Sequence, residues 1–278
     1  MLDYDRPTSL SDALRVRSSG ERLVLAGGTD IYPATRGQTL RQPVLDLTAV
    51  AGLRGIHRTG DGLSLGACTT WSDIIAADLP PAFDALKLAA AEVGARQIQN
   101  AGTIAGNICN ASPAADGVPA LLILDAEVEL ASLRGTRRLP LSQFIIGVRR
   151  TELRDDEIVT FLHIPEASMS GSSSFLKLGA RKYLVISIAM IAVRLAMTDG
   201  MVSDAALSVG SCSAVAVRLT GIEDLLRGQP AEAGLSRRIA DADVAACLSP
   251  IDDVRGTADY RMQAASELVR RAVERVLP

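Results

Sequence analysis

Two short glycine-rich stretches carry the residue types best suited to chemistry in this 278-residue chain. The first is AGGTD at residues 26–30, and the second is TIAGN at residues 103–107. Each offers consecutive backbone N–H groups without bulky side chains, and such a turn can hold a phosphate without a lysine. Together they could bind the two halves of a pyrophosphate. Either one alone could equally be a turn that needs glycine for a positive φ.

The second stretch belongs to a longer run of small and polar residues, GTIAGNICNASPAADG at residues 102–117. It contains no lysine, arginine or histidine, and we expect it to form a loop. Its short polar side chains are typical of a pocket wall that hydrogen-bonds a polar ligand. They belong to Thr103, Asn107, Asn110, Ser112 and Asp116. Neither stretch has the G-x-G-x-x-G spacing of a Rossmann fingerprint, which excludes that type of dinucleotide site.

The composition narrows the classes of partner. Hydrophobic residues make up 48% of the chain, aromatic residues 3%, and the formal net charge is −3. The clustered basic residues with interleaved aromatics that indicate nucleic-acid binding are absent. Residues 183–197, the most apolar stretch, are interrupted by Ser187 and Arg194 and fall short of a membrane span of roughly 20 residues. The N-terminus does not resemble a secretory signal, so we expect a cytoplasmic protein.

The cysteines do not indicate a metal site. Cys68, Cys109, Cys212 and Cys247 lack the paired spacings that hold zinc or an iron–sulfur cluster. We expect them to be buried free thiols. The sequence shows no recognisable catalytic acid–base pair either, so we assign no catalytic residue and no metal ligand to this chain.

The flanking sequence predicts the elements that would position the glycine-rich stretches. A capped helix is expected at residues 9–19, a strand runs into AGGTD, another strand follows at residues 43–48, and residues 55–67 resemble a hairpin. A Thr-x-x-Asp signal starts a helix at Thr70. Apolar spacing then predicts one longer helix over residues 83–97.

The second half of the chain is richer in predicted strands. An apolar helix and a strand are expected after residue 117, and a further strand at residues 157–165. Residues 169–174, MSGSSS, look like a small-residue linker and a domain boundary. β-prone runs with a hairpin turn at residues 198–200 follow, and residues 257–277 predict an amphipathic terminal helix.

As an ordered set, these motifs strongly resemble the flavin-binding subunit of the molybdenum hydroxylases. This family includes the medium subunits of xanthine dehydrogenase and carbon monoxide dehydrogenase. The resemblance covers almost the whole chain and rests on AGGTD, TIAGNICNASPAAD, EIVTFLHIP, FLKLGARKYLVIS and DVRGTADYRMQAASELVRRAV.

The resemblance implies an α+β fold with two domains. Residues 1–168 would form an FAD-binding region of the vanillyl-alcohol-oxidase (PCMH) type, with subdomains of about residues 1–55 and 56–168. Residues 174–278 would form a C-terminal α+β domain with an antiparallel sheet and helices.

The same resemblance implies which residues bind FAD. Residues 24–31 would wrap the pyrophosphate from one side and residues 103–107 from the other, while Asn110 and Asp116 would reach toward the flavin and its ribityl chain. The backbone around Thr160 and the side chain of Lys177 would lie near the isoalloxazine ring, where a cation stabilises reduced flavin. The implied binding residues are Val24, Leu25, Ala26, Gly27, Gly28, Thr29, Asp30, Ile31, Thr103, Ile104, Ala105, Gly106, Asn107, Asn110, Asp116, Thr160 and Lys177.

Several positions leave alternatives open. Ala105 stands where the family commonly has glycine, which allows close approach at a negative φ and causes strain at a positive one. Cys109 could touch the flavin or fill a small gap. Lys177 could also be an ordinary surface lysine. His57 and His163 match no flavin attachment motif, so we expect structural roles for them and non-covalent FAD.

The resemblance further implies an electron-transferring subunit. Electrons would arrive from [2Fe-2S] clusters on a small partner subunit, after leaving the substrate at a molybdenum cofactor on a large partner subunit. They would pass through FAD to NAD⁺ or another acceptor, in a dimer of heterotrimers. Two alternatives remain: a stand-alone flavin-dependent NAD(P)H oxidoreductase, and a non-catalytic scaffold that has lost the flavin.

Overall fold

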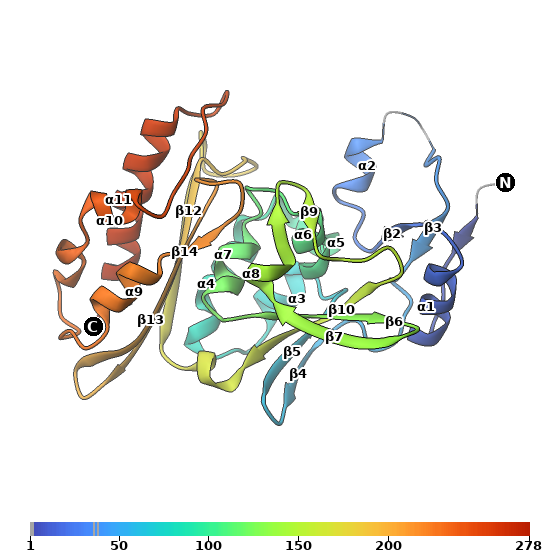
Figure 1. Ribbon diagram of the computed structural model, residues 1–278, viewed down its shortest axis with the longest axis horizontal. Helices are drawn as coiled ribbons and strands as arrows, with labels where there is room; N and C mark the ends of the chain where they lie inside the picture. The colour runs from blue at the N-terminus through green and yellow to red at the C-terminus, as the bar shows by residue number, and fades with distance from the viewer. Residues whose placement is uncertain (1–2, 36, 38) are drawn as a thin grey trace.

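The computed structural model describes residues 3–35, 37 and 39–278. Figure 1 shows three parts in a row: the N-terminal elements at one end, a central part built on a five-stranded sheet, and the C-terminal elements at the other end. Three buried hydrophobic clusters follow this division, and each pair of neighbouring parts shares some core residues. Among the described helices, none is long and apolar enough to cross a membrane; a cytoplasmic location stays a prediction.

The N-terminal part is a parallel sheet with strand order β1-β3-β2 and a flanking helix. The helix predicted at residues 9–19 is confirmed, because Ser9 caps it by accepting a hydrogen bond from the Asp12 N–H. AGGTD directly follows β2 and leads into a short helix. The elements are β1 (Tyr4–Asp5), α1 (Leu10–Ser18), β2 (Leu23–Leu25), α2 (Ile31–Ala34) and β3 (Val44–Asp46).

The central part is an antiparallel sheet with strand order β4-β5-β10-β6-β7. The predicted hairpin over residues 55–67 is confirmed, with Thr59 opposite Gly62 at its turn. The predicted strand at residues 157–165 is β10, in the middle of the sheet. The strands are β4 (Ile56–Thr59), β5 (Gly62–Gly66), β6 (Glu127–Ser132), β7 (Gly135–Pro140) and β10 (Ile158–Pro165).

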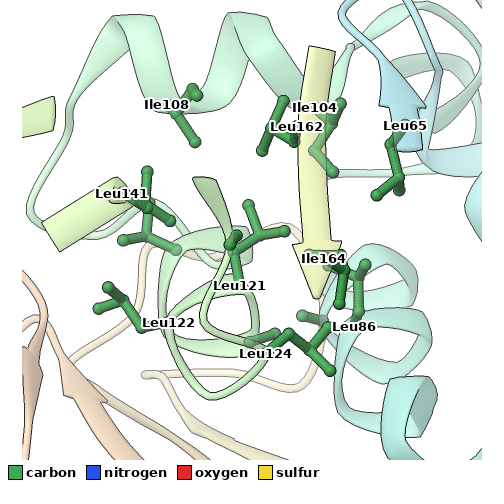
Figure 2. Close-up of a cluster of buried hydrophobic side chains, with 14 of the residues drawn as sticks. Leu65, Leu86, Ile104, Ile108, Leu121, Leu122, Leu124, Leu141, Leu162 and Ile164 are labelled. Atoms are coloured by element: carbon green, nitrogen blue, oxygen red, sulfur yellow. The ribbon is translucent and has the colours of Figure 1, made fainter. Parts of the chain in front are cut away.

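Helices cover one face of this sheet and bury an aliphatic core against it. Figure 2 shows Leu162 and Ile164 of β10 facing Ile104 of α6, Leu86 of α4 and Leu121 of α7. All five side chains are almost completely buried. The helices are α3 (Trp71–Ala76), α4 (Asp84–Glu92), α5 (Arg96–Ala101), α6 (Ile104–Asn110), α7 (Gly117–Leu122) and α8 (Leu141–Phe144), and a small hairpin of β8 (Ile145–Gly147) and β9 (Arg150–Thr151) follows α8.

Two predictions for this part are wrong. Residues 83–97 form a 3₁₀ turn and two helices rather than one helix, because Gly94 adopts a left-handed φ of 56° between α4 and α5. Residues 102–117 are not one loop, since Thr103 caps α6, which extends to Asn110. Helix α6 ends where Ala111 takes a left-handed φ of 45°.

The C-terminal part is an antiparallel sheet with strand order β11-β12-β13-β14, which confirms the expected α+β fold. The hairpin at residues 198–200 and the terminal helix are confirmed, but the linker prediction is wrong for residues 172–174, which belong to β11. The elements are β11 (Ser172–Leu178), β12 (Ala189–Thr198), β13 (Met201–Gly210), β14 (Val217–Arg218), α9 (Thr220–Leu226), α10 (Asp241–Ala245) and α11 (Ala258–Val276).

This sheet is buried on both faces, which explains its nearly continuous apolar strands. Ile191 and Val193 of β12 pack in one cluster with Val269 of α11, whereas the alternate residues Met190 and Ala192 join the central core. Figure 1 accordingly shows α11 on the outer side of the sheet and α4 and α7 on its inner side. The central and C-terminal parts therefore share one packed interface.

Candidate flavin-binding site

A cavity of about 660 Å³ lies where the three parts meet. This volume is within the roughly 300–1,000 Å³ of typical ligand sites. Its wall includes AGGTD after β2, the first turns of α6, and Leu184, Val185 and Ile186 from the β11–β12 connection. The two glycine-rich stretches, more than seventy residues apart in the sequence, therefore contribute to one site.

The AGGTD wall requires glycine at two positions. A Cβ on Gly27 would lie 1.9 Å from the carbonyl oxygen of Ala101, at the end of α5. Gly28 has a left-handed φ of 68°, and a Cβ there would lie 2.4 Å from the ring of Tyr32. Without a side chain, Gly27 can pack against the end of α5, and Gly28 can adopt its left-handed turn beside Tyr32.

The opposite wall is the first turn of α6. The Thr103 side chain accepts a hydrogen bond of 3.1 Å from the Gly106 N–H and so fixes the start of the helix. Ala105 lies in the right-handed helix and not at a positive φ, so alanine causes no backbone strain there. Among the described residues, the one group outside the α6 backbone within 4 Å of a Cβ on Gly106 would be the Thr103 hydroxyl, at 2.9 Å.

Asn107, one residue further along α6, carries an unsatisfied polar atom. Its Oδ1 is buried and has no hydrogen-bond partner among the described residues, although Asn107 lines the cavity. A buried acceptor without a partner costs about 1–3 kcal/mol. A ligand with an N–H or O–H donor at this position would satisfy it.

Asp116 and Lys177 form a buried pair between the central and C-terminal parts. The Lys177 ammonium lies 2.6 Å from Asp116 Oδ2, and the Ser187 hydroxyl donates a 2.5 Å hydrogen bond to Oδ1. Burial raises the pKa of Asp116, while Lys177 and Ser187 oppose that rise by stabilising the carboxylate. Lys177 also donates to the Glu92 carbonyl oxygen. Its charge is thus engaged within the protein.

Most of the residues that the sequence implicates lie together. The cavity wall contains Val24, Ala26, Gly27, Gly28, Thr29, Asp30, Ile31, Thr103, Ala105, Gly106, Asn107, Asn110 and Asp116. The other implicated side chains, those of Leu25, Ile104, Thr160 and Lys177, are not part of that wall. Thr160 is fully buried and bonds to Glu129, while its β10 neighbours Ile158 and Val159 do reach the cavity.

Sequence reasoning missed the rest of the wall. Trp71, Ile98 and Leu153 line it with apolar surface, and Arg149 reaches it from the β8–β9 hairpin. Isolated residues from unconnected elements leave no periodic signal in the sequence. Cys109 also lines the cavity while packing against the central core, so both of its proposed roles fit its position. Burial raises the pKa of its thiol to about 12.

The histidines lie away from this cavity. His163 on β10 is 3.0 Å from Glu129, and His57 is exposed on β4. Burial opposes ionisation of Glu129, yet hydrogen bonds from Thr160, Arg138 and His163 hold its pKa below the ordinary value. Within the described parts of the chain, no group of three or more His, Cys, Asp or Glu side chains could hold a metal ion.

Comparison with known families shows which family the chain belongs to. Residues 1–167 match the family described as the FAD binding domain in molybdopterin dehydrogenase. The chain belongs to this family. Residues 174–276 also match the CO dehydrogenase flavoprotein C-terminal domain. The resemblance seen in the sequence is therefore confirmed: the chain is the FAD-binding subunit of an oxidoreductase of the molybdenum hydroxylase class, and its cofactor is FAD.

Relatives of this FAD-binding subunit match over nearly their whole length. The nicotine 6-hydroxylase medium subunit of Paenarthrobacter nicotinovorans is 31% identical over 97% of this chain and 95% of its own length. The carbon monoxide dehydrogenase medium chain of Hydrogenophaga pseudoflava is 28% identical over 98% and 95%. The structure of reconstituted CO dehydrogenase from Oligotropha carboxidovorans gives a TM-score of 0.91 at 27% identity, covering 99% and 97%. The expected fold class is thus confirmed.

The cavity suits FAD on two independent observations. Gly106 lines the cavity without a side chain, and the Thr103 hydroxyl is the one described neighbour near a Cβ there, which permits close approach of a diphosphate to the backbone. The unpaired Asn107 oxygen needs a donor, and FAD carries hydroxyl, amine and imide N–H groups.

Proposed function

We propose that this chain transfers electrons through FAD within a heteromeric molybdenum hydroxylase. The observation that carries the proposal is the position of the cavity: glycine-rich walls enclose it on two sides, and the apolar residues Leu184 and Ile186 border it on another. When bound there, FAD supplies the exchange between one-electron and two-electron chemistry. The protein supplies binding, orientation and electrostatics.

The roles of individual residues follow from their contacts and remain part of the proposal. Backbone N–H groups around Gly28 would bind the diphosphate, and Gly106 would let it approach α6, whose first N–H groups already donate within the protein. Asn107 would accept a hydrogen bond from the cofactor. Asp116 lines the cavity, and Lys177 holds that carboxylate in place from the C-terminal part. We therefore propose an indirect role for Lys177, acting through Asp116.

The partners in this proposal are two further subunits. A small subunit with [2Fe-2S] clusters would donate electrons, and a large molybdopterin subunit would oxidise the substrate. The assembly would be a dimer of heterotrimers, and the acceptor would be NAD⁺ or another oxidant. The nicotine and carbon monoxide enzymes named above support this, since their similar chains are medium subunits.

Purification and reconstitution of the full chain test the proposal. We expect a yellow protein with stoichiometric FAD that turns over NADH slowly by itself and becomes reduced by substrate only when the two partners are present. Rapid NADH turnover by the isolated chain would favour the stand-alone flavin oxidoreductase. A protein that stays colourless after reconstitution with FAD would favour a scaffold without flavin.

A further inference from the structure

Arg149 is the only basic residue in the described wall of the FAD cavity. The acidic wall residues are Asp30, Asp116 and Glu157. Two of these have strong partners in the protein, since Lys177 lies 2.6 Å from Asp116 and Arg137 lies 2.7 Å from Glu157. Any positive charge offered to an anionic ligand by a side chain of this wall must therefore come from Arg149.

Arg149 lies at the turn of the β8–β9 hairpin, which fixes its position. The Arg149 N–H donates a 2.9 Å hydrogen bond to the carbonyl oxygen of Ala111, the residue that ends α6. Arg149 has a left-handed φ of 57°, and Ala111 one of 45°. This hydrogen bond holds the tip of the hairpin against the end of α6. The backbone of Arg149 is therefore fixed beside the cavity that its side chain lines.

The guanidinium itself has no carboxylate partner. Arg149 Nη1 donates to Asn110 Oδ1, and Asn110 Nδ2 donates a 2.8 Å hydrogen bond to Asp30 Oδ1. Across the described chain, no Asp or Glu oxygen lies within ion-pair distance of Arg149, whereas many of the other arginines have such a partner. A hydrogen bond to a neutral amide is weaker than one to an anion. The Arg149 guanidinium can therefore leave Asn110 for an anionic oxygen.

Arg149 is also close to the glycine wall. Asn110 lies four residues after Gly106 on α6, and positions four apart share one face of a helix about one turn apart. Asp30, which Asn110 contacts, is two residues after Gly28. Asn110, which accepts the hydrogen bond from the guanidinium, is thus one helical turn, roughly 5 Å along the helix axis, from Gly106.

We propose that Arg149 binds the diphosphate of FAD and makes the site select flavins that carry phosphate. This inference rests on the proposed binding of the diphosphate at the glycine walls. On binding, Arg149 exchanges the amide oxygen of Asn110 for a diphosphate oxygen, which gives a charge-assisted hydrogen bond in place of a neutral one. Asn110 keeps its hydrogen bond to Asp30 and continues to join the two walls.

The test compares three flavins on the full chain and its variants. Affinities for FAD, FMN and riboflavin are measured by quenching of flavin fluorescence for the wild type, Arg149→Ala, Arg149→Lys and Arg150→Ala. Arg150 is the matched control, because it is the adjacent exposed arginine of the same hairpin and does not line the cavity. Arg149→Ala should weaken FAD binding about 10- to 100-fold, the size expected for a hydrogen bond to a charged group. Riboflavin binding should change less than about twofold.

The other variants and conditions sharpen the result. Arg149→Lys should recover part of the FAD affinity, and Arg150→Ala should match the wild type. Added salt should weaken FAD binding more in the wild type than in Arg149→Ala, because the variant has lost the charge that salt screens. Equal weakening for FAD and riboflavin would place Arg149 at the flavin ring and overturn the proposal, as would unchanged FAD affinity. A wild-type chain that binds no FAD would overturn the proposed function as well.

Discussion

The glycine walls of the FAD site and the contact between the central and C-terminal parts are built in opposite ways. At the walls, Gly27 and Gly28 work through missing side chains, and neighbouring backbones come close. At the contact, Arg194 of β12 is 1% exposed and donates to the Ile123 carbonyl oxygen at 2.9 Å and to Asp204 at 2.8 Å. Lys177 and Asp116 form a buried ion pair there.

The difference predicts how each region responds to change. Walls made of backbone are sensitive mainly to added volume. A contact made of buried ions tolerates little loss of charge, because removing one partner leaves the other in an apolar environment. Stability should therefore depend mainly on the contact, and cofactor binding mainly on the walls.

The largest effect is expected for Lys177→Met. Methionine keeps the length and apolar character of the side chain but leaves the Asp116 carboxylate without its cation. We expect a loss of about 3 kcal/mol in the free energy of unfolding, measured by urea denaturation.

The double variant Asp116→Leu/Lys177→Met is the control for that prediction. It removes both charges, so it should be more stable than Lys177→Met alone, with a coupling energy of about 1 kcal/mol or more. Purely additive losses would show that the pair does not act as a unit.

Gly27→Ala should have the next largest effect. The new Cβ would meet the Ala101 carbonyl oxygen at 1.9 Å, and this contact is with backbone, which cannot move aside cheaply. Overpacking of this kind costs about 2 kcal/mol, and the displaced loop should also lose FAD, as measured by the flavin-to-protein absorbance ratio. The matched control is Gly60→Ala in the β4–β5 turn, where nothing lies within 4 Å of the added Cβ. Retention of FAD by Gly27→Ala at wild-type stability would count against the close-packed wall.

The two regions also differ in how far the sequence predicts them. AGGTD and TIAGN are continuous strings with a family pattern, so the sequence alone indicates the walls. Asp116 and Lys177 are 61 residues apart, and nothing local to either indicates that they pair. The glycine and asparagines of α6 favour a loop, whereas the Thr103 cap and the packing of Ile104 and Ile108 stabilise a helix.

Gly106→Val tests the α6 wall of the cavity and should have a smaller effect than Gly27→Ala. Only the Thr103 hydroxyl lies near the new Cβ, so the fold should be largely retained while the added methyl groups restrict the cavity. We expect FAD affinity to fall about tenfold, equivalent to about 1.4 kcal/mol, by titration of the apoprotein. A variant with wild-type affinity would show that the diphosphate does not approach Gly106. Gly106→Ala separates the contributions, because it adds one methyl group and should have the milder effect.

The smallest effect on stability is expected for the charge of Asp73. This residue lies in the first turn of α3, the helix whose Trp71 lines the cavity. Asp73 accepts two hydrogen bonds of 2.8 Å from Arg54 and one from the Thr70 N–H, in the capping box that the Thr-x-x-Asp pattern predicts. The Arg54 contact, reinforced by Thr70 and opposed by partial burial, lowers the pKa of Asp73 from 3.8 to about 2. The carboxylate therefore adds stability above pH 4, and this contribution is lost as the pH falls toward 2.

Asp73→Asn isolates that contribution, because the amide keeps an acceptor for the Thr70 N–H but removes the charge. The variant should be about 1 kcal/mol less stable than the wild type at pH 7, a value reduced by the exposure of Arg54. The difference should shrink between pH 4 and pH 2, where the wild-type carboxylate becomes protonated. A difference in stability that stays constant over this range would show that it does not come from the charge of Asp73. The ion pair would then contribute nothing, unlike the buried pair of Asp116 and Lys177.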